Sequence, residues 1–162
     1  MKLHIKERQY NWGDSFYVLT DENQRIFHVK SSVLLWNRKF EISDLDRNVL
    51  VTIKKEPKSL LKPKYYVTVD GHPTFSITRE LSLVPEYTFE GLDWQMHGLM
   101  LHEYEMRQNG QTVFTFREEV TPWSTRGVLT AEPSQILTAL AVVMTITYAM
   151  NAKDSETSTQ HL

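Results

Sequence analysis

The chain has no cysteine, few glycines and almost no net charge. Without cysteine, neither a disulfide framework nor a thiolate metal site can form. The six glycines occur singly, so there is no glycine-rich loop of the kind that cradles phosphate. A formal net charge of −2 argues against a nucleic-acid-binding protein driven by overall charge.

Motifs for catalysis and metal binding are also lacking. The chain has no Gly-x-Ser-x-Gly elbow and no His-Glu-x-x-His pair. Glu118 and Glu119 are adjacent in an expected strand, so their carboxylates point to opposite faces. His97 and His102, five residues apart near Asp93, also face opposite sides of a strand. We therefore expect no catalytic residue, no metal and no cofactor, and predict that the protein is not an enzyme.

Short runs of alternating apolar and polar residues fill the first 130 positions. One such run leads into Asp70-Gly71 and another into Asn109-Gly110, dipeptides that favour tight hairpin turns because they tolerate positive φ. Five prolines interrupt the runs and mark loops or sheet edges: Pro57, Pro63, Pro73, Pro85 and Pro122. The pattern predicts a mainly β, antiparallel sandwich or barrel.

A single apolar helix is expected at about 134–150. No charged residue occurs between Glu132 and Lys153, and the helix would be roughly 27 Å long at 1.5 Å per residue. Such a segment could span a bilayer over 134–151, or it could fill the centre of a β-structure. The uninterrupted apolar run extends only from Ala139 to Met144, and composition alone leaves both alternatives open.

The length suits one domain, which we place at residues 1–152. Residues 153–162 are polar and rich in Ser and Thr, so we expect a disordered tail. The N-terminal residues alternate between apolar and charged, without the apolar core of a signal peptide. We therefore expect a cytoplasmic protein, peripheral to the membrane if it binds lipid.

Three groups of segments together resemble one family. They are Trp12–Val18 with Asp21–Val29, Phe40–Asp46 with Leu50–Lys55, and Pro122–Ser124 with Gly127–Leu129. Their order is similar to that of the LURP-one-related proteins, here as a bacterial-type single-domain member. That family shares a fold with the tubby C-terminal domain and, more distantly, with the phospholipid scramblases. Two stretches depart from the family pattern: Arg117–Thr121, which is less basic, and Ser124–Gly127.

The resemblance implies a closed antiparallel barrel of about 12 strands around the apolar C-terminal helix. It implies no enzymatic activity. Large side chains are needed to fill such a barrel, so we expect Trp123 and Trp36 to pack inside it. The expected structural core also includes five helix residues: Ile136, Leu140, Val143, Met144 and Thr147.

A lysine-rich segment is the candidate binding site. Between positions 54 and 64, five lysines and Glu56 surround Leu60-Leu61; the lysines are Lys54, Lys55, Lys58, Lys62 and Lys64. Lysines around an apolar pair suit an anionic membrane surface. Similarity to tubby domains implies phosphoinositide-like headgroups. Alternatively, the segment is a solvated loop whose leucines pack onto the barrel.

Four other basic residues, Arg38, Lys39, Arg79 and Arg126, would join the lysines only if the fold brings them together. The leading hypothesis is a non-catalytic intracellular binding domain for anionic phospholipid or a phosphorylated ligand. One alternative is a protein-interaction scaffold with an unknown partner. The other is a membrane-anchored protein that uses 134–151 as its span. We expect no nucleic-acid partner.

Overall fold

The computed structural model describes residues 1–7, 15–34, 37–57, 61–100, 102–123 and 125–150. It contains a 12-stranded sheet followed by one helix. The strands are β1 (Lys2–Glu7), β2 (Ser15–Thr20), β3 (Arg25–Leu34), β4 (Asn37–Ser43), β5 (Val49–Lys55), β6 (Lys64–Val69), β7 (Phe75–Arg79), β8 (Tyr87–Glu90), β9 (Gln95–Met100), β10 (Glu103–Gln108), β11 (Gln111–Val120) and β12 (Thr125–Ala131).

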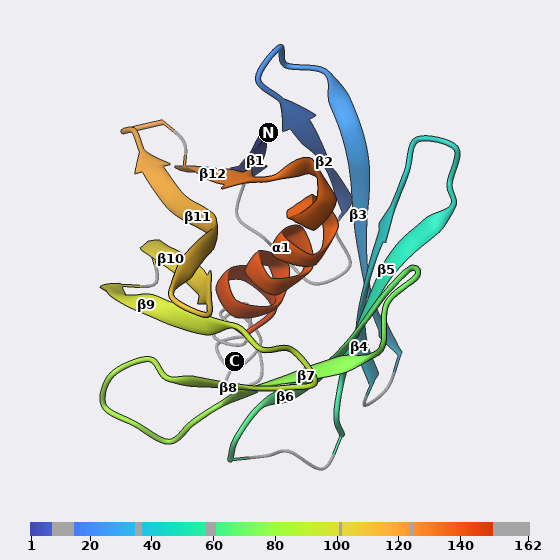
Figure 1. Ribbon diagram of the computed structural model, residues 1–162. Helices are drawn as coiled ribbons and strands as arrows, with labels where there is room; N and C mark the ends of the chain where they lie inside the picture. Colours follow the sequence, from blue (N-terminus) through green and yellow to red (C-terminus); the bar gives the residue numbers. More distant parts are fainter. Residues whose placement is uncertain (8–14, 35–36, 58–60, 101, 124, 151–162) are drawn as a thin grey trace, which may run out of the picture.

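The strands form an antiparallel meander that curls around the helix (Figure 1). Their spatial order is β8-β7-β6-β5-β4-β3-β2-β1-β12-β11-β10-β9. The pairing of β1 with β12 joins the start of the sheet to its end, Leu3 lying opposite Leu129. The expected mainly β barrel is therefore confirmed, as a nearly closed barrel whose two edge strands are β8 and β9.

The turn chemistry read from the sequence explains the hairpins. Asn109 and Gly110 join β10 to β11 with φ angles of 51° and 78°, the paired positive values of a tight hairpin turn. Asp70 and Gly71 begin the turn between β6 and β7. The five prolines expected to interrupt strands all lie in connections between strands.

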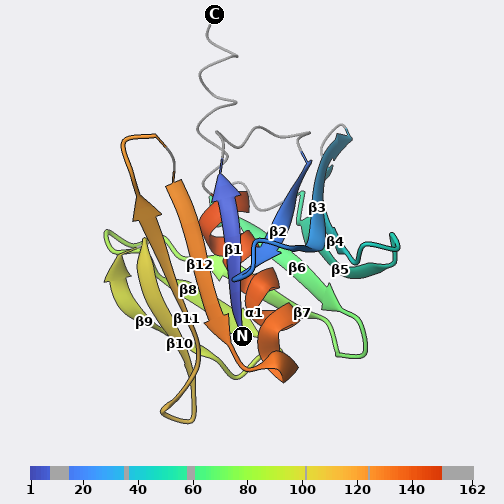
Figure 2. The ribbon, with the colours of Figure 1, turned by 90° about the horizontal axis from the view of Figure 1, so that it is seen from above.

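The helix runs through the barrel and ends at the opposite mouth (Figure 2). A 3₁₀ turn, η1 (Pro133–Gln135), leads into α1 (Ile136–Val143), and a π-helical segment, η2 (Met144–Ala149), completes it. The change from α- to π-helix occurs at Thr145, whose hydroxyl donates to the Ala141 carbonyl at 2.8 Å. The Met150 N–H donates to the Thr145 carbonyl, five residues earlier, as in a π-helix. The bounds agree closely with the expected helix at 134–150.

Burial distinguishes a helix at the centre of the sheet from a helix that spans a membrane. Every residue from Thr138 to Met150 is buried, as are the five helix residues expected in the core. The helix is enclosed by the inward-facing side chains of the strands, among them Leu3, Ile42 and Phe116. Within the described residues, no helix combines the length and apolarity needed to cross a bilayer. The expected tail, 153–162, lies outside the described residues.

The prediction that Trp123 packs in the core is wrong. Its side chain is 92% exposed, because it lies in the connection between β11 and β12, beyond the last paired residues. Of the two tryptophans that the structure describes, Trp94 is the buried one, with its ring centroid 5.8 Å from that of Phe114 in an edge-on contact. Trp36 lies outside the described residues.

Close contacts fix the helix against β10, β11 and β12. The Tyr104 hydroxyl lies 3.0 Å from the Thr147 hydroxyl in a buried hydrogen bond, and burial raises the pKa of Tyr104. On β12, Gly127 leaves room for two rings. A Cβ atom at Gly127 would lie 2.8 Å from both the Tyr148 hydroxyl oxygen and Phe116 Cε2. The missing side chain at Gly127 therefore lets the helix approach the sheet.

Charging the middle of the helix should prevent folding. Val142 is fully buried, and an unpaired carboxylate there costs several kcal/mol, comparable to a typical total stability of about 5–15 kcal/mol. We expect Val142→Asp to give no folded protein by far-UV circular dichroism. The control, Val49→Asp, changes a half-exposed valine and should fold. A soluble, monomeric Val142→Asp protein with native spectra would contradict the enclosed helix.

Adding one methyl group at Gly127 should destabilise the barrel. Gly127→Ala overpacks the site and should lower the free energy of unfolding by about 1–3 kcal/mol, measured by urea denaturation. Adding Tyr148→Phe to this variant removes one of the two clashing atoms and should recover part of the loss. A Gly127→Ala variant with an unchanged free energy of unfolding would show that the helix does not pack on β12 in this way.

Candidate anion-binding site

The outer face of β3–β6 carries a row of polar side chains across four strands. In the sheet register, Ser32 lies opposite Lys39, Lys39 opposite Lys54, and Lys54 opposite Tyr66. Directly opposed residues on one face have their Cβ atoms about 5 Å apart. The register therefore places two lysines side by side between a serine and a tyrosine.

This row forms part of a hollow of about 370 Å³, here called the basic hollow. Its lining residues are Ser32, Arg38, Lys39, Lys54, Lys55, Glu56, Pro57 and Tyr66. Four of these residues are cations and one is an acid. Lys39 also pairs with Glu41, at 3.1 Å. The excess positive charge makes the hollow suited to an anion.

Arg38 links the basic hollow to the end of the helix. Burial raises the pKa of Tyr65 to about 12, and the positive charge and hydrogen bond of Arg38 oppose that rise. The Tyr65 hydroxyl in turn lies 3.5 Å from the Ala149 carbonyl oxygen. The carbonyl end of a helix is its negative end, so a guanidinium is favourably placed nearby.

The five predicted lysines have different positions. Lys54 and Lys55 line the basic hollow. Lys64 borders it through Tyr66, with its Nζ atom 5.3 Å from the ring centroid. Lys62 forms an ion pair with Glu80 at 2.9 Å. Lys58 lies outside the described residues.

Two of the four additional cations join the hollow. Arg38 and Lys39 line it, whereas Arg79 lies at the end of β7 and Arg126 lies on β12 opposite Lys6 and Glu119. The sequence reasoning missed Ser32 and Tyr66. Part of the site could have been predicted from the Asp44–Asn48 turn, because the hairpin around this turn places residues of β4 opposite residues of β5, including Lys39 opposite Lys54.

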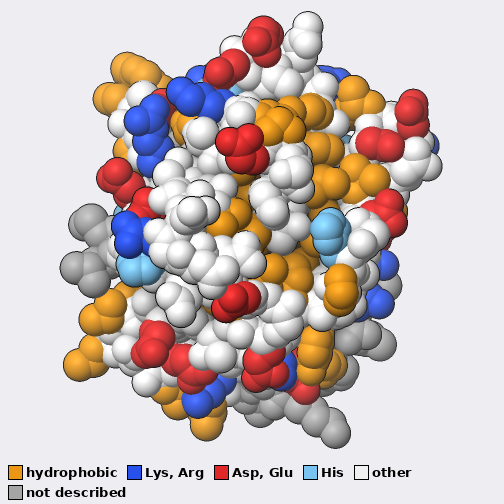
Figure 3. All heavy atoms as spheres, in the orientation of Figure 1, with side chains coloured by type: hydrophobic (Ala, Val, Ile, Leu, Met, Phe, Trp, Pro, Cys, Tyr) orange, Lys and Arg blue, Asp and Glu red, His pale blue; other side chains and the backbone are white. Residues whose placement is uncertain are grey.

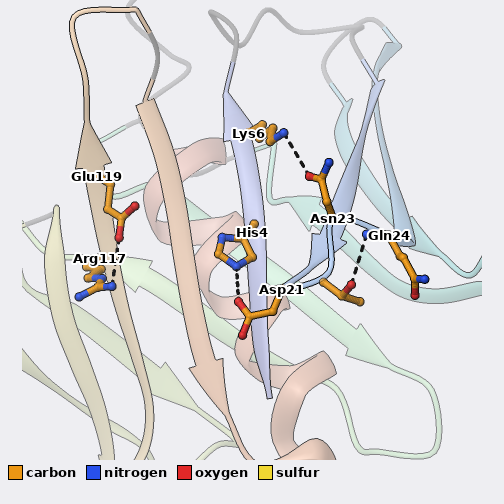
Figure 4. Close-up of polar contacts among 8 residues, drawn as sticks. His4, Lys6, Asp21, Asn23, Gln24, Arg117 and Glu119 are labelled. Carbon is orange, nitrogen blue, oxygen red and sulfur yellow. Dashed lines mark hydrogen bonds and ion pairs between the residues drawn. The ribbon is translucent and has the colours of Figure 1, made fainter.

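Two larger hollows, each about 610 Å³, have a smaller excess of positive charge, because each is lined by three Lys or Arg residues and two acids. Over β9–β12, Arg107 pairs with Glu105, and Arg117 pairs with Glu119 at 3.0 Å (Figure 4). Around Tyr17, Arg25 stacks 4.1 Å above the tyrosine ring, and Asp44 and Glu41 contribute negative charge. These hollows are therefore less suited to an anion than the basic hollow.

Two side chains on β1, His4 and Lys6, contact polar groups of the β2–β3 turn. His4 Nε2 lies 2.6 Å from Asp21 Oδ1, and this contact lowers the pKa of Asp21 (Figure 4). Lys6 donates to the Asn23 side chain at 3.3 Å in the same region. The basic hollow differs from the β1 face in its charge, because four cations gather there with a single acid in the lining.

The histidines expected to be poor metal ligands are dispersed. His97 lies opposite Glu105, whereas His102 Nδ1 lies 2.7 Å from Glu118 Oε2 on β11. Within the described residues, no group of three or more histidines and acids has the arrangement to hold a metal ion.

Comparisons with known proteins agree with this architecture. A solved structure of an Arabidopsis thaliana protein superposes with a TM-score of 0.58 over 90% of this chain and 91% of its own, at 12% sequence identity. At that identity the likeness shows the fold alone. None of the curated proteins matches the chain. The family model for LURP-one-related proteins matches residues 1–149, so the chain belongs to the LURP-one-related family.

Proposed function

We propose that this protein is a non-catalytic binding domain that holds a phosphate-bearing anion in the basic hollow. The observation that carries the proposal is the convergence of Arg38, Lys39, Lys54 and Lys55 around a hollow with one acid in its lining. The primary candidate is the headgroup of an anionic phospholipid. A free phosphorylated ligand offers the same chemistry, and the test below separates the two sources.

The residue types suit phosphate. A guanidinium can donate two parallel hydrogen bonds to phosphate oxygens, and Arg38 is held in place by its contact with Tyr65. The lysines add charge without fixed geometry. A lysine near an anionic membrane surface contributes about 1 kcal/mol to binding. The hydroxyl groups of Ser32 and Tyr66, which also line the hollow, can donate to further phosphate oxygens.

The resemblance to tubby C-terminal domains, and more distantly to scramblases, suggests phosphoinositide-like headgroups as one ligand class. The bacterial-type assignment rests on the sequence resemblance. A cytoplasmic location, peripheral to the membrane, would give the basic hollow access to anionic lipid.

Vesicle flotation tests the proposal. The protein should float with vesicles that contain phosphatidylserine or a phosphoinositide, and not with phosphatidylcholine alone. Moderate salt should weaken the binding, because exposed charges are screened within about 8 Å at physiological ionic strength. Replacing two lysines, Lys54→Gln/Lys55→Gln, should weaken binding by about thirtyfold.

The matched control is Lys2→Gln/Lys6→Gln, which removes the same charge from β1 and should bind almost normally. Equal losses in the two variants would contradict a local site and indicate a general charge effect. A soluble inositol phosphate that competes with the vesicles would identify headgroup binding. Binding of that compound without any vesicle binding would indicate a free phosphorylated ligand.

A protein-interaction scaffold is the second candidate. It is favoured by two exposed apolar side chains near the β11–β12 connection: Trp123, 92% exposed, and Val120, 72% exposed. Aromatic residues of this kind are enriched at protein interfaces. The scaffold would be favoured over lipid binding by two results together. The wild-type protein would bind neither anionic vesicles nor inositol phosphates, and the Trp123→Ala variant would lose binding to a protein partner.

A further inference from the structure

Two neighbouring connections, β5–β6 and β7–β8, are tied together. Lys62 Nζ lies 2.9 Å from Glu80 Oε2, and the Thr88 hydroxyl donates to the other oxygen of Glu80 at 2.7 Å. The Arg79 backbone N–H donates to the Pro63 carbonyl at 2.9 Å. The described part of the first connection and the whole of the second therefore form one surface.

This surface presents four large apolar side chains to solvent, here called the leucine tip. They are Leu61 (78% exposed), Leu81 (67%), Leu83 (fully exposed) and Val84 (50%). The loop that carries three of them is closed by a backbone hydrogen bond from Glu80 to Glu86 at 2.8 Å. Isolated exposed apolar side chains are ordinary, but three leucines and a valine on two tied loops suggest an apolar partner.

The leucine tip lies at the same end of the barrel as the basic hollow. The antiparallel order places the β5–β6 and β7–β8 connections at the end where the helix finishes. Lys54 and Lys55 are the last two residues of β5, at the entrance to the first of these connections. Cations and exposed apolar side chains therefore occur together, the combination that binds anionic bilayer interfaces.

The turns at the opposite end are richer in acids. The turns β2–β3, β4–β5, β6–β7 and β8–β9, together with the residue between β12 and the helix, are all described and carry one cation, Arg47. Their acids are Asp21, Glu22, Asp44, Asp46, Asp70, Asp93 and Glu132. Figure 3, which views this end, shows acidic side chains around its rim together with some Lys and Arg side chains. The described parts of the β5–β6 and β7–β8 connections carry fewer acids, Glu56, Glu80 and Glu86, and Glu80 is paired with Lys62. The end where the helix begins is therefore the less favourable one for an anionic bilayer.

We propose that the leucine tip enters the interface of an anionic bilayer, so that the barrel docks with the end of its helix towards the membrane. The proposal rests on the proposed function and adds the kind of surface and the orientation. The cations of the basic hollow contact lipid phosphates while the tip leucines enter the headgroup region. Salt then weakens the charge contacts but leaves the apolar contribution.

The absence of cysteine permits a direct test of orientation. Leu83→Cys, labelled with an environment-sensitive fluorophore, should show a blue shift and higher emission when phosphatidylserine vesicles are added. The matched control, Leu45→Cys, labels a leucine that is 56% exposed in the β4–β5 turn at the opposite end. Its emission should not change. Vesicles of phosphatidylcholine alone should affect neither label.

A second variant measures the contribution of the tip to binding. Leu81→Ser/Leu83→Ser should lower vesicle partitioning by about tenfold or more, since each leucine loses apolar burial, while Leu45→Ser should not. Unchanged partitioning, or unchanged emission of the label at position 83 on vesicle-bound protein, would contradict insertion of the leucine tip. Neither result would contradict anion binding in the basic hollow. No binding of the wild-type protein to any anionic vesicle would overturn both proposals.

Discussion

Enclosure of one apolar helix by a single sheet is the constraint on which the rest of the structure depends. The residues from Thr138 to Met150 are buried, and the strands direct Leu3, Ile42, Phe116 and similar side chains inward to cover them. A sheet that curls this far must satisfy its backbone groups between neighbouring strands. The pairing of β1 with β12 achieves this by joining the first strand to the one directly before the helix. The interior of the barrel is therefore filled by the packed side chains of the helix and the strands.

Because the interior is filled, binding is left to the outer face and the two ends. The basic hollow lies where β4 begins and β5 finishes, and Arg38 connects it through Tyr65 to the last turn of the helix. The same helix that forms the core thus helps to position a candidate ligand contact. Charge is distributed unevenly as well: acidic turns surround the end where the helix begins, and lysines gather near the end where it finishes.

Much of the fold could be predicted because the signals were local. The Asn109-Gly110 turn, the strand-breaking prolines and the uncharged helix each act within a few residues. The position of Trp123 could not be predicted this way, since only the extent of β11–β12 pairing decides whether it enters the barrel. The candidate site could be predicted only in part. Lys54 opposite Lys39 follows from the hairpin register, but the pairing of Lys62 with Glu80 depends on two connections meeting in space.

The central claim is that helix and sheet are one cooperative unit, and native-state hydrogen exchange tests it most directly. Amides from Ile136 to Ala149 should exchange only through global unfolding, with the same free energy as the central amides of β4, β5 and β12. That result would show that the barrel does not persist without its helix. Helix amides that exchange at a much lower free energy, while the strands stay protected, would contradict the account.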